Sequence, residues 1–152
     1  DPDTCAAFSW DTHNGNFKCL RRKVPKLDQA IHALITDLHE RGLDKDVAVV
    51  IGGEMGRRPL IGGTFMSGPD GRDHWSQAGF SLIAGGGLRM GQVIGKTDPR
   101  AERPVGNPYT PQNVLATLYH VLGVDLKTTT LPDRTGRPMH LLDDREPVKE
   151  LL

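Results

Sequence analysis

The feature that most constrains the fold is an amphipathic helix followed at once by a short apolar strand. Residues 26–42, "KLDQAIHALITDLHERG", place apolar side chains at the i, i+3, i+4, i+7 spacing of a helix that buries one face. Pro25 suits the start of this helix and Gly42 suits the position after its end. Residues 46–51 then form an apolar run without polar alternation, which is typical of a parallel strand covered on both faces. This order predicts an α/β fold.

Similar signals continue along the chain. Residues 79–87, "GFSLIAGGG", predict a second apolar strand closed by a tight glycine turn, and residues 91–97 predict an edge strand. Thr110 suits the N-cap and Pro111 the first position of a second helix, which ends at Gly123. The predicted apolar stripe of that helix is Val114, Leu115, Leu118, Tyr119 and Leu122. A short strand, "PMHLL", follows at 138–142. With 152 residues and no internal repeat, we expect a single domain.

Composition excludes several classes of function. Lysine and arginine balance aspartate and glutamate at 19 each, so bulk charge favours neither nucleic acid nor an anionic membrane. Aromatic residues are only 5%, too few for a base-stacking platform. No window approaches the length of a membrane span. Cys5 and Cys19 lack metal-type spacing and are compatible with a disulfide or with two thiols.

The stretch "FSWDTHNGNF", residues 8–17, contains the first candidate site. Asp11 and His13 are two residues apart, so an extended backbone points both side chains to the same face. A carboxylate and an imidazole aimed at one point suit a divalent metal or a proton-transfer site. The alternative is a polar strand end, because Asn14-Gly15 is a strong turn signal.

A second candidate follows the strand at 46–51. In open α/β sheets, ligands bind beyond the carboxyl ends of the strands, which is where Glu54 lies. The alternative is an ion pair of Glu54 with Arg57 or Arg58 in the adjoining loop.

A third candidate lies in the long segment 55–78, whose length is typical of a functional loop. It contains "GRDHW", with Asp73 and His74 adjacent. His74 suits a ligand, and Asp73 suits either a second ligand or an orienting partner for an imidazole. Trp75 could form a wall of the site. Together the three clusters predict one or two divalent cations held by nitrogen and oxygen ligands, with zinc, calcium, magnesium and manganese as the candidates.

The order of these motifs resembles a known bacterial family. The chain carries "WDTHNGNF", "VAVVIGGEMGRRP", "GRDHW", "LIAGGGLRMGQVIGKTD", "YTPQNVLATLYHVLGVD" and "LPDRTGRPMHLL" in one series from Trp10 to Leu152. This series resembles the carboxyl-terminal part of domain-of-unknown-function 1501 proteins, which look like sulfatases of the alkaline phosphatase superfamily. The resemblance implies a three-layer α/β sandwich around a largely parallel sheet, present here as a partial, C-terminal domain over residues 1–152.

The resemblance also implies a function. Members of the superfamily are metal-dependent hydrolases of sulfate or phosphate esters, so a small anionic ester is the implied substrate. Asp11 and His13 match an Asp and His that bind one metal, and His74 resembles a late histidine ligand with Asp73 beside it. The resemblance places Glu54 where related enzymes carry an Asp-His pair. The resemblance places Arg57 near enough to hold an ester oxygen, and the alternative is a salt bridge from Arg57 to a loop carboxylate.

Two departures from the family pattern qualify these expectations. Glu54 and Met55 stand where the superfamily has an Asp-His pair, so one nitrogen ligand is missing. The superfamily's nucleophile lies in an amino-terminal half, and we expect this chain to be a fragment without it. The alternative function is a non-catalytic, exported binding or surface protein on a degenerate hydrolase scaffold. Relatives are commonly exported, which implies a periplasmic or secreted location for the parent protein.

Overall fold

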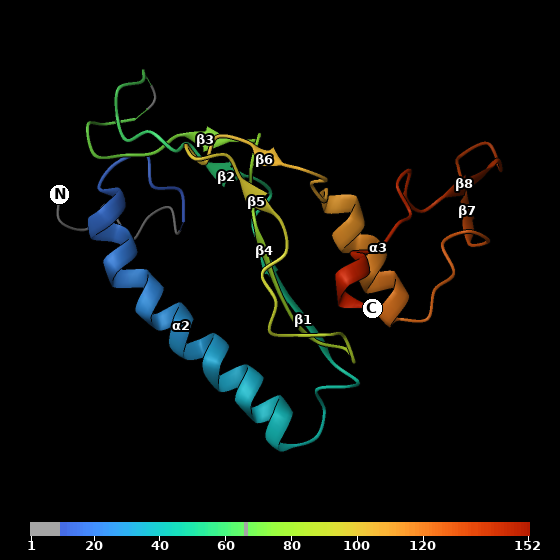
Figure 1. The fold of residues 1–152 in the computed structure, drawn as a ribbon. Helices are drawn as coiled ribbons and strands as arrows, with labels where there is room; N and C mark the ends of the chain where they lie inside the picture. The colour runs from blue at the N-terminus through green and yellow to red at the C-terminus, as the bar shows by residue number, and fades with distance from the viewer. Residues whose placement is uncertain (1–9, 66) are drawn as a thin grey trace.

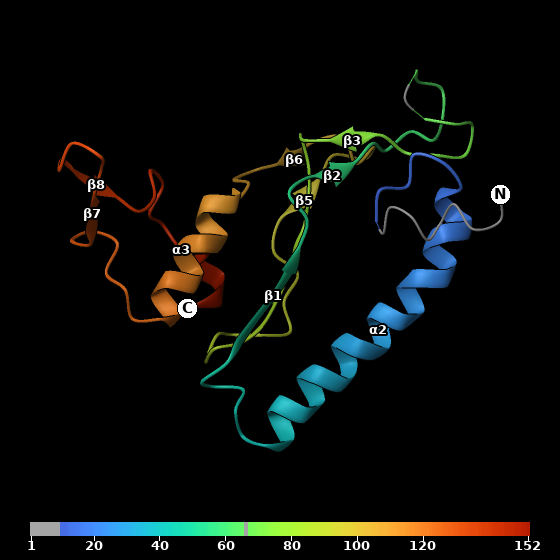
Figure 2. The same cartoon turned by 180° about the vertical axis from the view of Figure 1, so that it is seen from behind.

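The computed structural model describes residues 10–65 and 67–152. The described elements follow one another in this order: α2 (Asn16–Glu40), β1 (Ala48–Gly52), β2 (Gly56–Arg57), β3 (His74–Trp75), β4 (Ser81–Gly85), β5 (Lys96–Thr97), β6 (Pro104–Val105), α3 (Pro111–Val121), β7 (Thr130–Pro132), β8 (Pro138–His140) and the short 3₁₀ helix η1 (Lys149–Leu151). Figures 1 and 2 show the β1–β4 pair lying between α2 on one side and α3 on the other.

The predicted three-layer sandwich around a largely parallel sheet is wrong. In the described part of the chain, the strands form four separate two-stranded sheets, β1-β4, β2-β3, β5-β6 and β7-β8, and every pair is antiparallel. The apolar runs at β1 and β4 do form strands, and they pair with each other, with Val50 opposite Ile83. An apolar run predicts that both faces of a strand are apolar, but it does not define the direction of the neighbouring strand. A parallel pair needs a crossover, usually helical, and the described residues between β1 and β4 form no helix.

The β1–β4 pair ends in the predicted glycine turn. Gly85, Gly86 and Gly87 all have positive φ, of 75°, 66° and 70°. Three successive residues in the left-handed region are tolerated because glycine has no Cβ to clash with the backbone. The Gly86 N–H donates to the Val47 carbonyl at 2.9 Å and so closes the end of the strand pair.

Helix α2 begins ten residues earlier than the sequence pattern predicts, so Pro25 lies inside the helix rather than at its start. Proline removes one backbone hydrogen bond from a helix and disfavours helical geometry in the residue before it. The first turn is nevertheless held in place, because the Asn16 N–H donates to the Asp70 carbonyl and Asn16 and Cys19 are buried. The helix ends at Glu40, and Gly42, whose φ is +68°, lies just after the end as predicted.

Helix α3 has the predicted bounds, but its buried face is not the predicted one. Thr110 is its N-cap and Pro111 its first residue, as expected. The buried residues are Asn113, Ala116 and Thr117, whereas Leu122 of the predicted stripe is 73% exposed. The Thr117 hydroxyl donates to the Asn113 carbonyl and accepts from the Val148 N–H at 2.9 Å. Polar contacts with the C-terminal segment therefore decide which face of α3 is covered.

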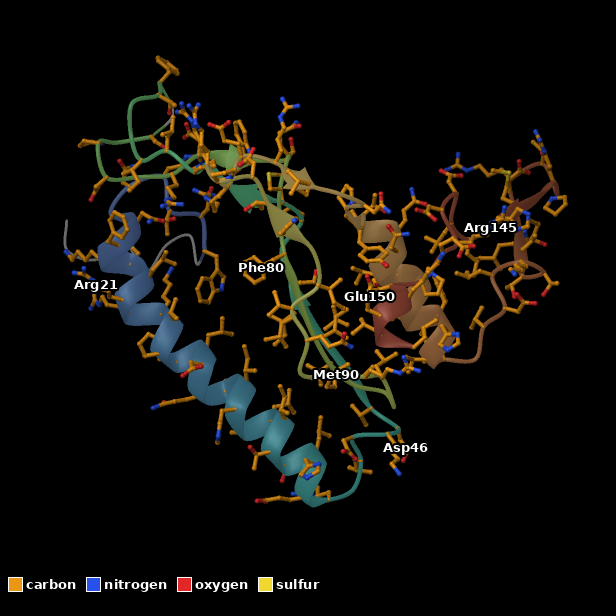
Figure 3. The ribbon with its side chains drawn as sticks, viewed as in Figure 1. Arg21, Asp46, Phe80, Met90, Arg145 and Glu150 are labelled. Carbon is orange, nitrogen blue, oxygen red and sulfur yellow. The ribbon has the colours of Figure 1, made fainter. Side chains whose placement is uncertain are left out.

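The apolar surface of the chain is only partly covered. No residue of the predicted α2 stripe is fully buried; its members are Leu27, Ala30, Ile31, Leu34, Ile35 and Leu38. Phe80, just before β4, is 85% exposed, and Figure 3 shows it on the side of the strands that faces α2. The chain exposes 11174 Å², whereas a compact monomer of this mass exposes about 7,600 Å². The packing is therefore open.

No helix among the described residues is both long enough and apolar enough to cross a lipid bilayer. Cys19 is buried and does not carry a free thiol, and Cys5 lies outside the described residues.

Candidate metal centre

The candidate site lies where the segment before α2 meets the loop that leads to β3. We call this region the loop corner; it comprises residues 11–16, 62–65 and 67–74. Backbone hydrogen bonds join its two halves: the Gly68 N–H donates to the His13 carbonyl at 3.0 Å and the Arg72 N–H to the Thr12 carbonyl at 3.0 Å. The Asp70 carboxylate accepts from the Gly15 N–H at 2.9 Å. Segments about sixty residues apart in sequence are thereby held together.

Glycine makes this close contact possible. A Cβ added at Gly71 would lie 1.8 Å from the His13 carbonyl oxygen, and one added at Gly68 would lie 2.1 Å from Asn14 Oδ1. Both distances are far shorter than a van der Waals contact, so any side chain at Gly71 would push the two backbones apart.

The local backbone aims Asp11 and His13 at one point. Thr12, between them, is buried, and its hydroxyl donates to Asn16 Oδ1 at 2.6 Å. Asp11 and His13 project on the opposite side, as expected for alternate residues of an extended segment. His13 Nε2 lies 3.2 Å from Asp11 Oδ1.

Strands β2 and β3 bring two further groups to the same carboxylate. Arg57 and His74 are directly opposite each other in this antiparallel pair, so their side chains share a face. His74 Nε2 lies 3.0 Å from Asp11 Oδ1. The Arg57 guanidinium donates to Asp11 Oδ1 and to the Arg72 carbonyl.

Three potential ligands consequently converge. One ligand atom each from Asp11, His13 and His74 lies within 4.8 Å of the other two, and among the described residues this is the set that could hold a metal ion. The two imidazole rings are 4.9 Å apart, centre to centre, and tilted by 50°. Two imidazole nitrogens and one carboxylate oxygen suit zinc and its neighbours among the transition metals.

Asp73 lies behind His13. Its Oδ1 is 3.1 Å from His13 Nδ1, and its two oxygens also accept hydrogen bonds from the hydroxyls of Ser67 and Thr64. These two hydroxyls, with a smaller effect of His13, lower the pKa of Asp73 to about 2, so the carboxylate is charged at neutral pH. A charged carboxylate can only accept hydrogen bonds.

The position of His13 between two carboxylates bears on whether a cation fits. Asp73 accepts at Nδ1, so Nδ1 carries the proton, and in the neutral ring Nε2 presents its lone pair toward Asp11. A lone pair facing a carboxylate oxygen is unfavourable unless Nε2 gains a proton or a cation lies between the two atoms. A divalent cation satisfies that arrangement, and the donor set therefore fits one.

The charge on Asp11 is also favoured. Burial raises the pKa of Asp11, but hydrogen bonds from Arg57 and His74 and the charges of His13 and Arg57 outweigh it, so the pKa lies below its ordinary value. Asp11 is therefore available as an anionic ligand at neutral pH.

The structure brings four of the five predicted ligand residues together. Asp11, His13 and His74 form the candidate ligand set, and Asp73 contacts His13 from behind. Glu54 is exposed in the turn after β1 and is not a member of the Asp11–His13–His74 set.

The remaining loop residues are placed as follows. Arg57 is at the site, where its guanidinium donates a hydrogen bond to Asp11. Trp75 donates its indole N–H to the Glu102 carbonyl at 2.6 Å, so this polar group is engaged away from the candidate ligands. The sequence motifs do not identify Thr64 and Ser67, which donate hydrogen bonds to Asp73. The only sequence feature that points to them is their position in the same glycine-rich loop as Asp73.

The arrangement defines a candidate Asp-His-His metal site on a largely antiparallel α+β chain. Residues 4–152 match the family described as "Protein of unknown function (DUF1501)", so the chain belongs to this family. Searches of curated proteins and of solved structures found no match.

Proposed function

We propose that the chain forms the metal-binding part of a hydrolase that cleaves sulfate or phosphate esters. The observation that carries this proposal is the convergence of His13 Nε2 and His74 Nε2 on one oxygen of Asp11, at 3.2 and 3.0 Å. These three residues would hold the cation. The motif series that resembles sulfatase-like enzymes of the alkaline phosphatase superfamily supports the choice of ester chemistry.

A bound divalent cation would supply a Lewis acid for an ester oxygen and would stabilise negative charge at the reacting centre. Residues of this chain would bind the ester. The Arg57 guanidinium is held beside Asp11 by its bond to the Arg72 carbonyl. There it adds a positive charge with a fork of donors that matches an anionic sulfate or phosphate group. We therefore assign Arg57 to substrate binding.

The nucleophile is not assigned to a described residue. Thr12 is 4% exposed and its hydroxyl donates to Asn16, so it does not face the candidate ligands. The Ser67 hydroxyl donates to Asp73. We expect the attacking group to come from outside residues 10–152, and we expect hydrolysis by this chain alone to be weak.

The lack of an assigned nucleophile among the described residues favours a second candidate function. A ligand set with no activated hydroxyl among the described residues suits a protein that binds a metal, or a metal-bound anion, without hydrolysing an ester. This would be an exported binding or surface protein on a hydrolase-like scaffold. For either function we propose a periplasmic or secreted location.

Metal binding and hydrolysis are tested separately. The first measurement is calorimetric titration of the chain with zinc and manganese, using Asp11→Asn, His13→Ala and His74→Ala as site variants. His39→Ala is the matched control, because His39 also lies 3.0 Å from an aspartate, Asp44, but is outside the loop corner. We expect the site variants to lose binding and the control to retain it. Retention of binding in all three site variants would contradict the proposed site.

The second measurement is hydrolysis of aryl sulfate and aryl phosphate by the longest natural polypeptide that contains this chain. We expect turnover that depends on added metal and falls at least about 100-fold in His13→Ala. Tight metal binding without turnover of either ester would favour the binding protein over the hydrolase.

A further inference from the structure

We propose that Asp73 is a positioning residue for His13 rather than a ligand, and that Thr64 and Ser67 hold it in that role. This inference rests on the proposed metal site, and it assigns to the loop before β3 the task of setting the tautomer and orientation of one ligand. The family description states no function for any of these residues.

The contacts of Asp73 leave it directed at the far side of the His13 ring. Its Oδ1 contacts Nδ1 of His13, the nitrogen that is not directed at Asp11. The carboxylate is 17% exposed and does not belong to the group of ligand atoms within 4.8 Å of one another. Asp73 thus acts on the candidate cation only through His13.

Two hydroxyls fix the carboxylate itself. Ser67 donates to the same oxygen that contacts His13, and Thr64 donates to the other oxygen. The Ser67 backbone N–H donates in turn to the Thr64 hydroxyl at 3.1 Å. Both hydroxyls donate to Asp73, so the carboxylate cannot rotate without losing these hydrogen bonds. In this orientation its Oδ1 is also the acceptor nearest to His13 Nδ1.

This arrangement selects one form of the neutral imidazole. A carboxylate at Nδ1 requires the proton there, which leaves the Nε2 lone pair directed toward the ligand set. Metal-binding histidines are commonly oriented in this way by a carboxylate, and loss of that carboxylate typically lowers metal affinity by 10- to 100-fold. The Ser67 hydroxyl is 3.5 Å from Nδ1, too far to replace Asp73.

The test combines zinc titration with nitrogen NMR of the histidine rings. The variant is Asp73→Asn, which keeps the shape of the side chain but removes its charge. The matched control is Asp44→Asn, because Asp44 contacts Nδ1 of the exposed His39 at 3.0 Å. We expect Asp73→Asn to weaken zinc binding by about 10- to 100-fold and to shift the His13 ring away from the Nδ1–H form. Asp44→Asn should leave zinc affinity and the His13 signals unchanged.

Two results with Asp73→Asn would overturn the inference. Unchanged zinc affinity together with unchanged His13 signals in Asp73→Asn would show that Asp73 does not orient the ring. Complete loss of zinc binding, equal to that in Asp11→Asn, would show that Asp73 is itself a ligand.

A wild-type chain that binds no zinc would contradict the proposed site, but the ring signals of the metal-free protein still decide the positioning role. Should Asp73→Asn fail to fold, the double variant Thr64→Val/Ser67→Ala is expected to change affinity and tautomer in the same direction, and no change in either would contradict the inference.

Discussion

The loop corner and helix α2 meet at Asn16, yet they are held in place in different ways. In the loop corner, two backbones contact each other through glycine and exchange hydrogen bonds, and every predicted ligand there has a polar partner. Along α2, the apolar stripe lacks a fully buried residue. The difference teaches that polar contacts within the loop corner define the site geometry. The apolar stripe of α2, in contrast, is not buried against another apolar face of the described chain.

The largest expected contrast is between two leucines. Leu126 is 7% exposed and Leu34, on α2, is 46% exposed. Truncation of a buried leucine to alanine costs about 2–5 kcal/mol, whereas truncation of an exposed residue usually changes stability by less than about 0.5 kcal/mol. We therefore expect Leu126→Ala to lower the free energy of unfolding in urea far more than Leu34→Ala. Equal losses would show that the α2 stripe is covered in solution.

The next prediction concerns the glycine contact in the loop corner. In Gly71→Ala, the new methyl group would meet the His13 carbonyl, and overpacking that forces backbone to move typically costs about 1–3 kcal/mol. Zinc affinity should fall with it, because His13 is displaced. Gly53→Ala is the control, since its Cβ would have an ordinary contact of 3.4 Å. A Gly71→Ala chain with wild-type zinc affinity would mean that the two halves of the loop corner are not in close contact.

A smaller effect is expected where α3 meets the C-terminal segment. Thr117→Val keeps the volume of the side chain but removes the hydroxyl that accepts from the Val148 N–H. A buried donor left without an acceptor costs about 2 kcal/mol. Thr128→Val removes an exposed hydroxyl that donates to Asp125, so it should be nearly neutral in the same urea measurement. No difference between the two variants would show that water replaces the Thr117 contact.

The smallest expected effect is a pH dependence of the β7–β8 turn. Hydrogen bonds from the Thr135 hydroxyl, the Arg137 N–H and the Thr135 N–H lower the pKa of Asp133 from its ordinary value of 3.8. The charged form is therefore favoured in the folded turn. Its contribution is present above pH 3.8 and is lost as pH falls through the lowered pKa. The Thr135 amide resonance should titrate below pH 3.8, and this titration should be absent in Asp133→Asn.

The sequence predicts local features better than it predicts packing. Thr110, Pro111 and Gly42 mark helix ends correctly, because caps depend on the chemistry of a few adjacent residues. The apolar runs at β1 and β4 identify strands but leave their relative direction open, which is why the predicted parallel sheet is wrong. The local pattern predicts a helix start at Pro25, because the bond from the Asn16 N–H to the Asp70 carbonyl, which holds the first turn of α2, is a long-range contact.

The candidate site shows the same division. The alternation rule places Asp11 and His13 on one face from sequence alone. That His74 joins them depends on the pairing of β2 with β3 and on the backbone bonds across the loop corner, which are long-range contacts. Glu54 was included because of its position after an apolar strand, a rule that holds for open parallel sheets and does not apply to an antiparallel pair.

The central claim is that Asp11, His13 and His74 hold one divalent cation, and zinc-edge X-ray absorption of the zinc-loaded chain tests it most directly. The account predicts a first shell with two imidazole nitrogens at about 2.0–2.1 Å and oxygen at about 2.0–2.2 Å. It also predicts that zinc added to His74→Ala gives the spectrum of unbound zinc, whereas His39→Ala gives the wild-type spectrum. A first shell made of oxygen alone, or one that is the same in wild type and His74→Ala, would contradict it.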